Sequence, residues 1–151
     1  MRSYLLVIDD TAEARAALRF AARRAARTGA TVELLAVIPP QEFVQWGGVQ
    51  AAMEDEARLR AEAMVLQASG AIVEEAGITP TITIREGDPI KAVADMLRER
   101  DDFAGLVLGA AAEGGPGPLV SHFAATVAGT LPCTVTVVPG NLSDEAIDRL
   151  G

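Results

Sequence analysis

The sequence is poor in residues that form disulfides, bind metals or stack against one another. Its 151 residues include one cysteine, Cys133, and one histidine, His122, and only 4% of them are aromatic. A single cysteine excludes an internal disulfide, and a single histidine excludes a metal site built on several histidines. We therefore expect a protein of a reducing compartment, the cytoplasm. Its core should consist of small aliphatic residues, with Cys133 as one member.

Positive charge and long apolar runs are also scarce. Thirteen Lys and Arg residues stand against 21 Asp and Glu, which gives a formal net charge of −8. Because an acidic surface repels phosphate backbones, we expect no nucleic-acid partner. No apolar run approaches the roughly 20 residues that cross a bilayer. The run at residues 4–8 meets two aspartates too soon to be a signal peptide, so we expect a soluble protein with no membrane partner.

What the sequence does contain is an alternation of strand and helix patterns. Aliphatic and β-branched runs predict five strands, at residues 4–8, 31–38, 79–85, 103–109 and 133–138. Amphipathic stretches predict helices at residues 12–27, 51–76, 89–100 and 121–130, and a short one that starts at Ser143. Strands alternating with helices form a parallel sheet with right-handed crossovers. We predict one α/β domain over residues 1–151, an open five-stranded parallel sheet with helices on both faces.

Local signals mark several helix boundaries. Asp10 or Thr11 is placed to cap the first helix, and Gly29 stands where that helix should stop. Asp88 followed by Pro89 is a typical start for the third helix.

The second helix and the stretch before it are less clearly patterned. Apolar residues predicted to lie near one face of this helix are Met53, Leu59, Ala63, Leu66 and Ile72. Residues 41–50 are predicted to form a loop that contains Phe43 and Trp46. These two aromatic side chains would cover a ligand crevice, join a subunit contact or pack on the following helix.

The functional edge of such a sheet can be placed from its topology. Ligands of open parallel sheets bind beyond the carboxyl ends of the strands, at the switch point of the strand order. The segments expected there are residues 9–11, 37–40, 85–88 and 109–122. In an acidic protein an anionic ligand needs backbone N–H groups, and the glycine run at residues 114–117 is a candidate source of them.

Three stretches carry a resemblance to a known family. They are VIDDTAEARAALRFA at residues 7–21, GDPIKAVADM at residues 87–96, and VLGAAAEGGPGPLVSHFAATVAGTLPCTVTVVPG at residues 107–140. In these stretches, and in element order over nearly the whole chain, the sequence resembles the universal stress protein family. The resemblance implies a Rossmann-like fold of the adenine nucleotide alpha hydrolase type and a regulatory role in stress response.

Many members of that family bind ATP through a motif of Gly, two residues, Gly, nine residues, then Gly followed by Ser or Thr. Here Gly109 takes the first position, Ala112 the second, and the pair Ser121-His122 the last, in a loop one residue shorter. The resemblance implies that Asp9 faces the adenine and that Val37 contacts the base. The predicted site, for ATP with Mg²⁺, consists of Asp9, Asp10, Thr11, Val37, Gly109, Ala110, Gly114, Gly115, Gly117, Ser121 and His122.

Some features of the sequence are compatible with other functions. The pair Asp9-Asp10 also suggests a response-regulator receiver, but the third strand ends at Arg85 and the only lysine, Lys91, lies in a helix. His122 is interpreted either as part of the site or as a solvent-facing residue at a helix start. Three roles remain: a regulatory domain that binds an adenine nucleotide, a homodimeric interaction module without nucleotide, and a slow ATPase.

Binding is favoured over catalysis, because no acid–base set is evident beyond the two neighbouring aspartates. The fifth predicted strand is apolar and would lie at a sheet edge, so a homodimer through residues 135–138 is expected.

Overall fold

The computed structural model describes residues 2–40 and 47–151, so Phe43 and Trp46 lie outside the described part. The elements are β1 (Ser3–Val7), α1 (Ala12–Thr28), β2 (Thr31–Ile38), α2 (Gly47–Ala76), β3 (Thr81–Glu86), α3 (Pro89–Glu99), β4 (Phe103–Ala110), α4 (Pro118–Ser121), β5 (Thr134–Pro139) and α5 (Asp144–Leu150). A π-helical turn (His122–Thr126) and a 3₁₀ turn (Ala128–Thr130) follow α4.

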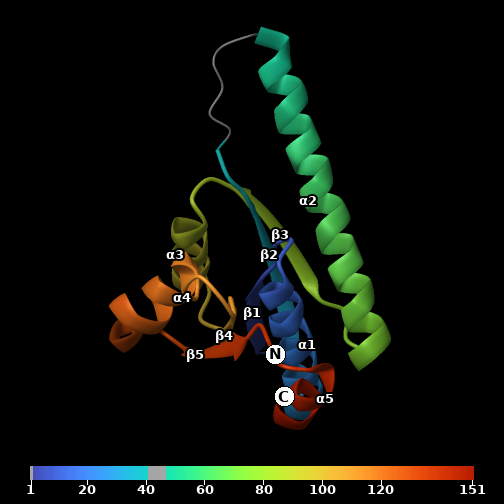
Figure 1. The fold of residues 1–151 in the computed structure, drawn as a ribbon, viewed down its shortest axis with the longest axis vertical. Coiled ribbons are helices and arrows are strands. Elements are labelled where there is room, and N and C mark those ends of the chain that lie inside the picture. Colours follow the sequence, from blue (N-terminus) through green and yellow to red (C-terminus); the bar gives the residue numbers. More distant parts are fainter. Residues whose placement is uncertain (1, 41–46) are drawn as a thin grey trace.

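The five strands form one parallel sheet in the order β3-β2-β1-β4-β5. From β1, the strands β2 and β3 follow one another on one side of the sheet. The chain then crosses over, and β4 and β5 lie on the other side of β1. The switch point therefore lies between β1 and β4. Helices α1, α2 and α5 cover one face and α3 and α4 the other, which confirms the predicted open sheet with helices on both faces (Figure 1).

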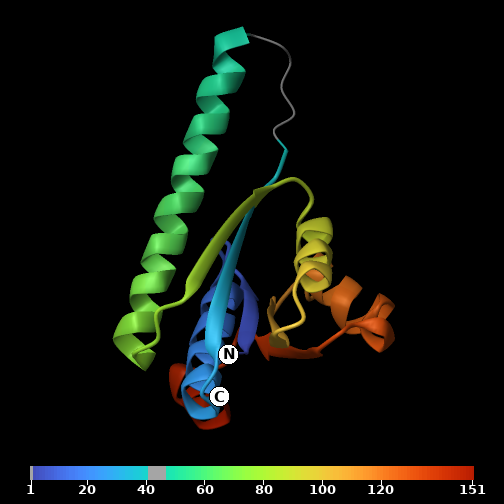
Figure 2. The same cartoon turned by 180° about the vertical axis from the view of Figure 1, so that it is seen from behind.

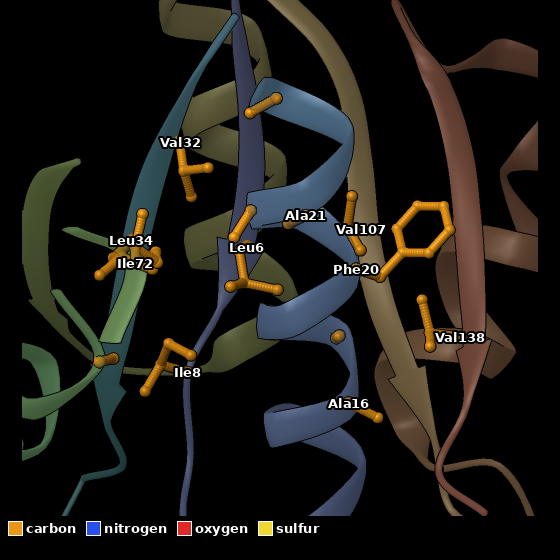
Figure 3. Packing of buried hydrophobic residues seen from close by; sticks show 14 of the residues in the cluster. Leu6, Ile8, Ala16, Phe20, Ala21, Val32, Leu34, Ile72, Val107 and Val138 are labelled. Carbon is orange, nitrogen blue, oxygen red and sulfur yellow. The ribbon is translucent and has the colours of Figure 1, made fainter. Parts of the chain in front are cut away.

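Small side chains let α1 lie close against the sheet. Ala17, Ala21 and Ala25 of α1 are at most 1% exposed and belong to one buried cluster with Leu6 of β1 and Val107 of β4. Figure 3 shows Ala21 of this cluster together with Leu6 and Val107. On the other face, a second cluster centres on α3 and the buried side chains of β1 and β4, among them Val93, Met96, Leu5 and Leu106. The core is thus mainly aliphatic, as the shortage of aromatics predicts, with Phe20, Phe103 and Phe123 as its buried aromatic members.

Capping side chains fix three helix starts. Thr11 Oγ1 accepts a hydrogen bond from the Ala14 N–H at 3.1 Å, so Thr11, and not Asp10, caps α1. Asp88 caps α3 and Ser143 caps α5 in the same manner, each at 3.1 Å. Gly29 ends α1 with a φ of 71°, a left-handed conformation that suits glycine.

The predicted helix over residues 121–130 is wrong in extent and in type. Helical structure begins at Pro118, because the proline ring presets the first helical φ and Gly117 before it adopts a φ of 101°. From His122 the turn widens, and the Val127 N–H donates to the His122 carbonyl five residues back, at 3.0 Å. The early start moves residues 118–120 to the rim of the carboxyl edge.

The second helix differs from the prediction at its start and in its buried face. It begins at Gly47 instead of residue 51. Its buried residues are Ala57, Ala61, Val65, Ala68 and Ile72. Of the residues predicted for the apolar face, only Ile72 is buried, whereas Met53, Leu59, Ala63 and Leu66 are exposed. The small residues face the body, since close helix packing selects them.

Figures 1 and 2 show that the amino-terminal half of α2 extends beyond the sheet. The other end of the fold is closed by α5, which packs on α1 through the buried Ile147. Arg19 donates to both carboxylate oxygens of Asp148, at 2.8 and 2.9 Å, and Arg23 adds a third bond at 3.0 Å. The arginines of α1 therefore hold α5 in place.

Candidate functional site

A crevice opens at the carboxyl ends of β1 and β4, at the switch point of the sheet. Its volume is about 190 Å³. Four predicted site residues line it: Asp9 after β1, Val37 of β2, Gly109 of β4 and Gly117 before α4. The remaining lining residues are Val7, Ile8, Glu13, Pro89, Pro116, Pro118, Leu119 and Val120. The lining is mainly apolar, with two carboxylates, Asp9 and Glu13, on the side formed by β1 and α1.

Thr11 connects the cap of α1 to the carboxylate in the crevice. Its hydroxyl donates to Asp9 Oδ1 at 2.5 Å while its oxygen accepts the Ala14 N–H. The Asp9 side chain is thus oriented by a residue that the backbone of α1 holds in turn. This leaves the carboxylate free to use its second oxygen as an acceptor for a ligand N–H or O–H group.

Gly109 has a structural function as well as a place in the crevice. A Cβ atom at this position would lie 2.1 Å from the carbonyl oxygen of Glu13, so β4 and the first turn of α1 contact each other backbone to backbone. Gly140 is similar, because its Cβ would lie 2.9 Å from the Ala110 carbonyl oxygen, which already accepts the Gly140 N–H at 2.8 Å. Close packing therefore requires glycine at position 109, the first position of the motif considered in the sequence.

The loop after β4 depends on its glycines for a different reason. Gly114, Gly115 and Gly117 have φ values of 76°, 93° and 101°, which side chains rarely adopt, yet a Cβ at each would meet nothing within 4 Å. The loop is closed by a hydrogen bond from the Ala111 N–H to the Pro116 carbonyl at 3.4 Å. It therefore presents open backbone to the surroundings, and Gly117 brings it to the crevice wall.

The structure does not bring the other predicted residues into this crevice. Asp10 lines an adjoining groove of about 300 Å³ between α1 and α2, together with Arg15 and Met64. This groove shares Ile8 and Asp9 with the crevice, but Asp10 lines only the groove. The Ser121 N–H donates to the Gly117 carbonyl at 3.1 Å inside the helical turn.

Four further predicted residues, and Thr11, do not line the crevice. Ala110 is the last residue of β4, and its carbonyl accepts the Gly140 N–H. The His122 ring stands edge-on to Phe123 with ring centres 4.8 Å apart. Gly114 and Gly115 occupy the outer part of the loop and are exposed. Thr11 lies in a smaller hollow beside the crevice, which it shares with Asp9 and Gly109.

Two apolar residues at the rim of the crevice, Pro89 and Leu119, are not among the predicted site residues. Pro89 and Leu119 enter the crevice because α3 and α4 begin directly at the carboxyl edge. For Pro89 a signal existed, since the Asp88-Pro89 helix start follows the third strand within a few residues. For Leu119 the signal was the proline at position 118, which marks a first helical position.

The described residues contain no ready-made metal site and no membrane segment. Within residues 2–40 and 47–151, no group of three or more His, Cys, Asp or Glu is placed to hold a metal ion. None of the helices described here combines the length and apolar character that crossing a bilayer requires. Burial raises the pKa of the half-buried Cys133 thiol, which agrees with its interpretation as a core residue.

Taken together, the sheet order and the crevice define an open α/β domain with a hollow at its switch point. The family model described as "Universal stress protein family" matches residues 1–139. The chain therefore belongs to the universal stress protein family. No functionally curated protein matches the sequence.

Solved structures agree with this assignment at the level of the fold. The universal stress protein UspA from Lactobacillus plantarum is 20% identical with a TM-score of 0.75, over 91% of this chain and 97% of that one. The Archaeoglobus fulgidus universal stress protein in complex with dAMP is 20% identical with a TM-score of 0.61, over 91% and 97% of the two chains. An Arabidopsis thaliana family member with AMP bound is 14% identical with a TM-score of 0.60, over 96% and 95%.

Proposed function

We propose that this protein is a regulatory domain of the cytoplasm that binds an adenine nucleotide in the crevice at the switch point, as part of a stress response. The observation that carries the proposal is the convergence of Asp9, Val37, Gly109 and Gly117 on one apolar pocket. The nucleotides bound by the A. fulgidus and A. thaliana proteins, dAMP and AMP, support it.

The chemistry of the lining suits the two ends of a nucleotide differently. Val7, Val37 and Pro89 offer apolar surface to a flat base, and Asp9 accepts a hydrogen bond from an amino or ribose hydroxyl group. Phosphates would lie toward the glycine loop, where backbone N–H groups of Gly114, Gly115 and Gly117 serve as donors. Pro116 and Pro118 have no N–H to offer there.

The size of the crevice bears on the length of the phosphate chain. About 190 Å³ is below the roughly 300–1,000 Å³ of common small-molecule pockets, so the enclosed part of the ligand is the nucleoside. The phosphates then extend along the open loop, and Mg²⁺, where present, is held mainly by the phosphate oxygens of ATP.

Calorimetric titration with AMP, and with ATP and Mg²⁺, tests the proposal. We expect micromolar binding that weakens about tenfold in Asp9→Ala, equivalent to about 1.4 kcal/mol. Asp10→Ala is the matched control, because this neighbouring carboxylate lines the other groove and its loss should leave affinity unchanged. Absence of binding at millimolar AMP and ATP would overturn the proposal and favour an interaction module without nucleotide.

A second proposal concerns self-association through the edge strand β5. Val137 on this strand is 37% exposed, and Val135 beside it is half-buried, so the edge presents apolar β-branched side chains and open ladder groups. We propose a homodimer in which β5 of two copies pair. Sedimentation of Val137→Lys should then show a smaller species than wild type, and an unchanged profile would contradict the pairing.

A further inference from the structure

Helix α2 is apolar on two opposite faces. Its inner face packs on the body through the buried alanines, Val65 and Ile72. On the outer face Leu59, Leu66 and Val73 are 63%, 66% and 46% exposed. An amphipathic surface helix normally carries polar residues on its outer side, so this second face needs a separate explanation.

The spacing on the outer face is that of a helix–helix seam. Leu59, Ala63, Leu66, Gly70 and Val73 follow one another at steps of four, three, four and three residues, the 3.5-residue period of coiled coils. All five are exposed. They span about 21 Å along the helix at 1.5 Å per residue. We refer to these five residues as the α2 seam.

The alternation of large and small side chains selects how a partner helix lies on the seam. When a second α2 runs antiparallel, Leu66 can face Gly70 and Val73 can face Ala63, so each large side chain meets a small one. In a parallel pair, each residue would face its own copy, which places Leu66 on Leu66 and leaves a gap at Gly70. Interdigitation of large with small therefore favours the antiparallel arrangement.

Charge beside the seam favours the same register. Arg60 and Glu74 are exposed and lie on the same flank of the seam, 14 residues apart. In the antiparallel register, Arg60 of each copy faces Glu74 of the other, and the two-fold symmetry makes this pair twice. Within one copy Arg60 forms an ion pair with the exposed Glu56 at 3.9 Å, a pair that costs little to exchange.

We propose that the α2 seam is a self-association surface on which α2 of a second copy of this chain packs antiparallel. This interface is separate from the β5 edge, because α2 covers β2 and β3 at the other end of the sheet. Two surfaces at opposite ends of one sheet join dimers into larger assemblies. A seam of about 21 Å buries less than the roughly 1,600 Å² of a standard interface. We therefore expect a weak contact that forms at protein concentrations of tens to hundreds of micromolar.

The first test is sedimentation velocity of the full chain from 10 to 500 µM, in a Val137→Lys background that removes pairing through β5. Leu66→Gln should weaken association at least tenfold. The matched control is Leu150→Gln, since Leu150 on α5 is 57% exposed and lies away from the seam. A monomer throughout this range, or equal losses from the two substitutions, would overturn the proposal.

A charge exchange tests the register itself. Arg60→Glu alone and Glu74→Arg alone should each weaken association about fivefold to tenfold, because each places like charges opposite one another twice. An equimolar mixture of the two variants should recover wild-type association, since both opposite-charge pairs re-form only between unlike copies. Failure of the mixture to recover would refute the antiparallel register. The nucleotide affinity measured in the same variants should not change, which separates this outcome from that of the crevice.

Discussion

The two ends of the parallel strands are held together in different ways. At the amino ends of the strands, which we call the amino edge, charged side chains contact one another. At the carboxyl ends, the carboxyl edge, main-chain atoms of neighbouring elements lie in close contact. The buried Glu33 of β2 accepts from Arg100 at 2.6 Å and from the Thr83 hydroxyl at 3.2 Å. Arg100 also binds both oxygens of Asp102, each at 2.8 Å, and lies over the Phe103 ring. The polar groups of this edge satisfy one another and offer little to a ligand.

The carboxyl edge is shaped by close approaches of the main chain. Gly109 lies against the carbonyl of Glu13, and the Gly140 N–H donates to Ala110. Because these contacts use no side chains, they do not engage the carboxylate of Asp9, which lines the crevice and accepts a hydrogen bond from the Thr11 hydroxyl. The comparison teaches that the crevice lies where close backbone packing shapes the fold, whereas the buried ion-pair network lies at the opposite ends of the strands.

Substitution of Gly109 by alanine is the largest expected effect at either edge. The new Cβ would lie 2.1 Å from the Glu13 carbonyl oxygen, so β4 and α1 must separate. We expect a loss of about 3 kcal/mol in the free energy of unfolding, measured by urea titration with circular dichroism. Gly115→Ala is the control: its surroundings are open and only its φ of 93° is strained, at about 1–2 kcal/mol. Equal losses would show that the α1–β4 contact is not tight.

Removal of Arg100 tests the amino edge. Arg100→Met leaves the Glu33 carboxylate, only 5% exposed, with no guanidinium partner in this network and only the hydrogen bond from the Thr83 hydroxyl. We expect a loss of about 2–3 kcal/mol, less than for a fully buried pair because the Arg100 side chain is 33% exposed.

The double variant Glu33→Met/Arg100→Met serves as control for that experiment. It should be more stable than Arg100→Met alone, since no unpaired charge remains buried. Nucleotide affinity should stay at the wild-type value in both variants. A double variant less stable than the single one, or a changed affinity, would mean that the two edges are not independent.

The features that the sequence predicts are those encoded by near neighbours in the chain. The caps at Thr11, Asp88 and Ser143 lie three residues from the N–H groups they bind, and strand periodicity is equally local. Two of the proposed site residues, Asp9 and Val37, line the crevice because strand ends meet at one edge of the sheet. Ser121 and His122 are predicted from their place in a motif and do not line the crevice, where helical structure already begins at Pro118.

What the sequence does not show is which distant segments meet. The need for glycine at position 109 depends on Glu13, and the partner of Arg19 is Asp148, 129 residues away. The second helix illustrates the same limit: its apolar residues lie on two faces, and periodicity alone does not say which face meets the body. Its buried face is the one with small side chains, and only the packed structure shows this.

The smallest expected effect is the loss of stability at low pH through the contact between α1 and α5. This contact is held by charged side chains, as the amino edge is. Hydrogen bonds from Arg19, then from Arg23, lower the pKa of Asp148 from 3.8 to about 2. Because the folded pKa lies below the unfolded one, this stabilisation is fully present above about pH 5 and is lost as the pH falls from 4 through 2. Wild type should therefore be more stable than Asp148→Asn at pH 6, and the difference in urea midpoint should shrink steadily toward pH 2.5.

Asp144→Asn is the control for this titration, because its carboxylate is 77% exposed and lies 3.8 Å from Arg19. Its effect on the midpoint should be small and vary little over the same range. Nucleotide affinity should not depend on Asp148, because α5 packs on α1 and contributes no residue to the crevice. Asp148→Asn should bind as wild type does at pH 6, where both proteins are folded. A difference between Asp148→Asn and wild type that persists unchanged at pH 2.5 would show that Asp148 acts through packing on α1, and not through its charge.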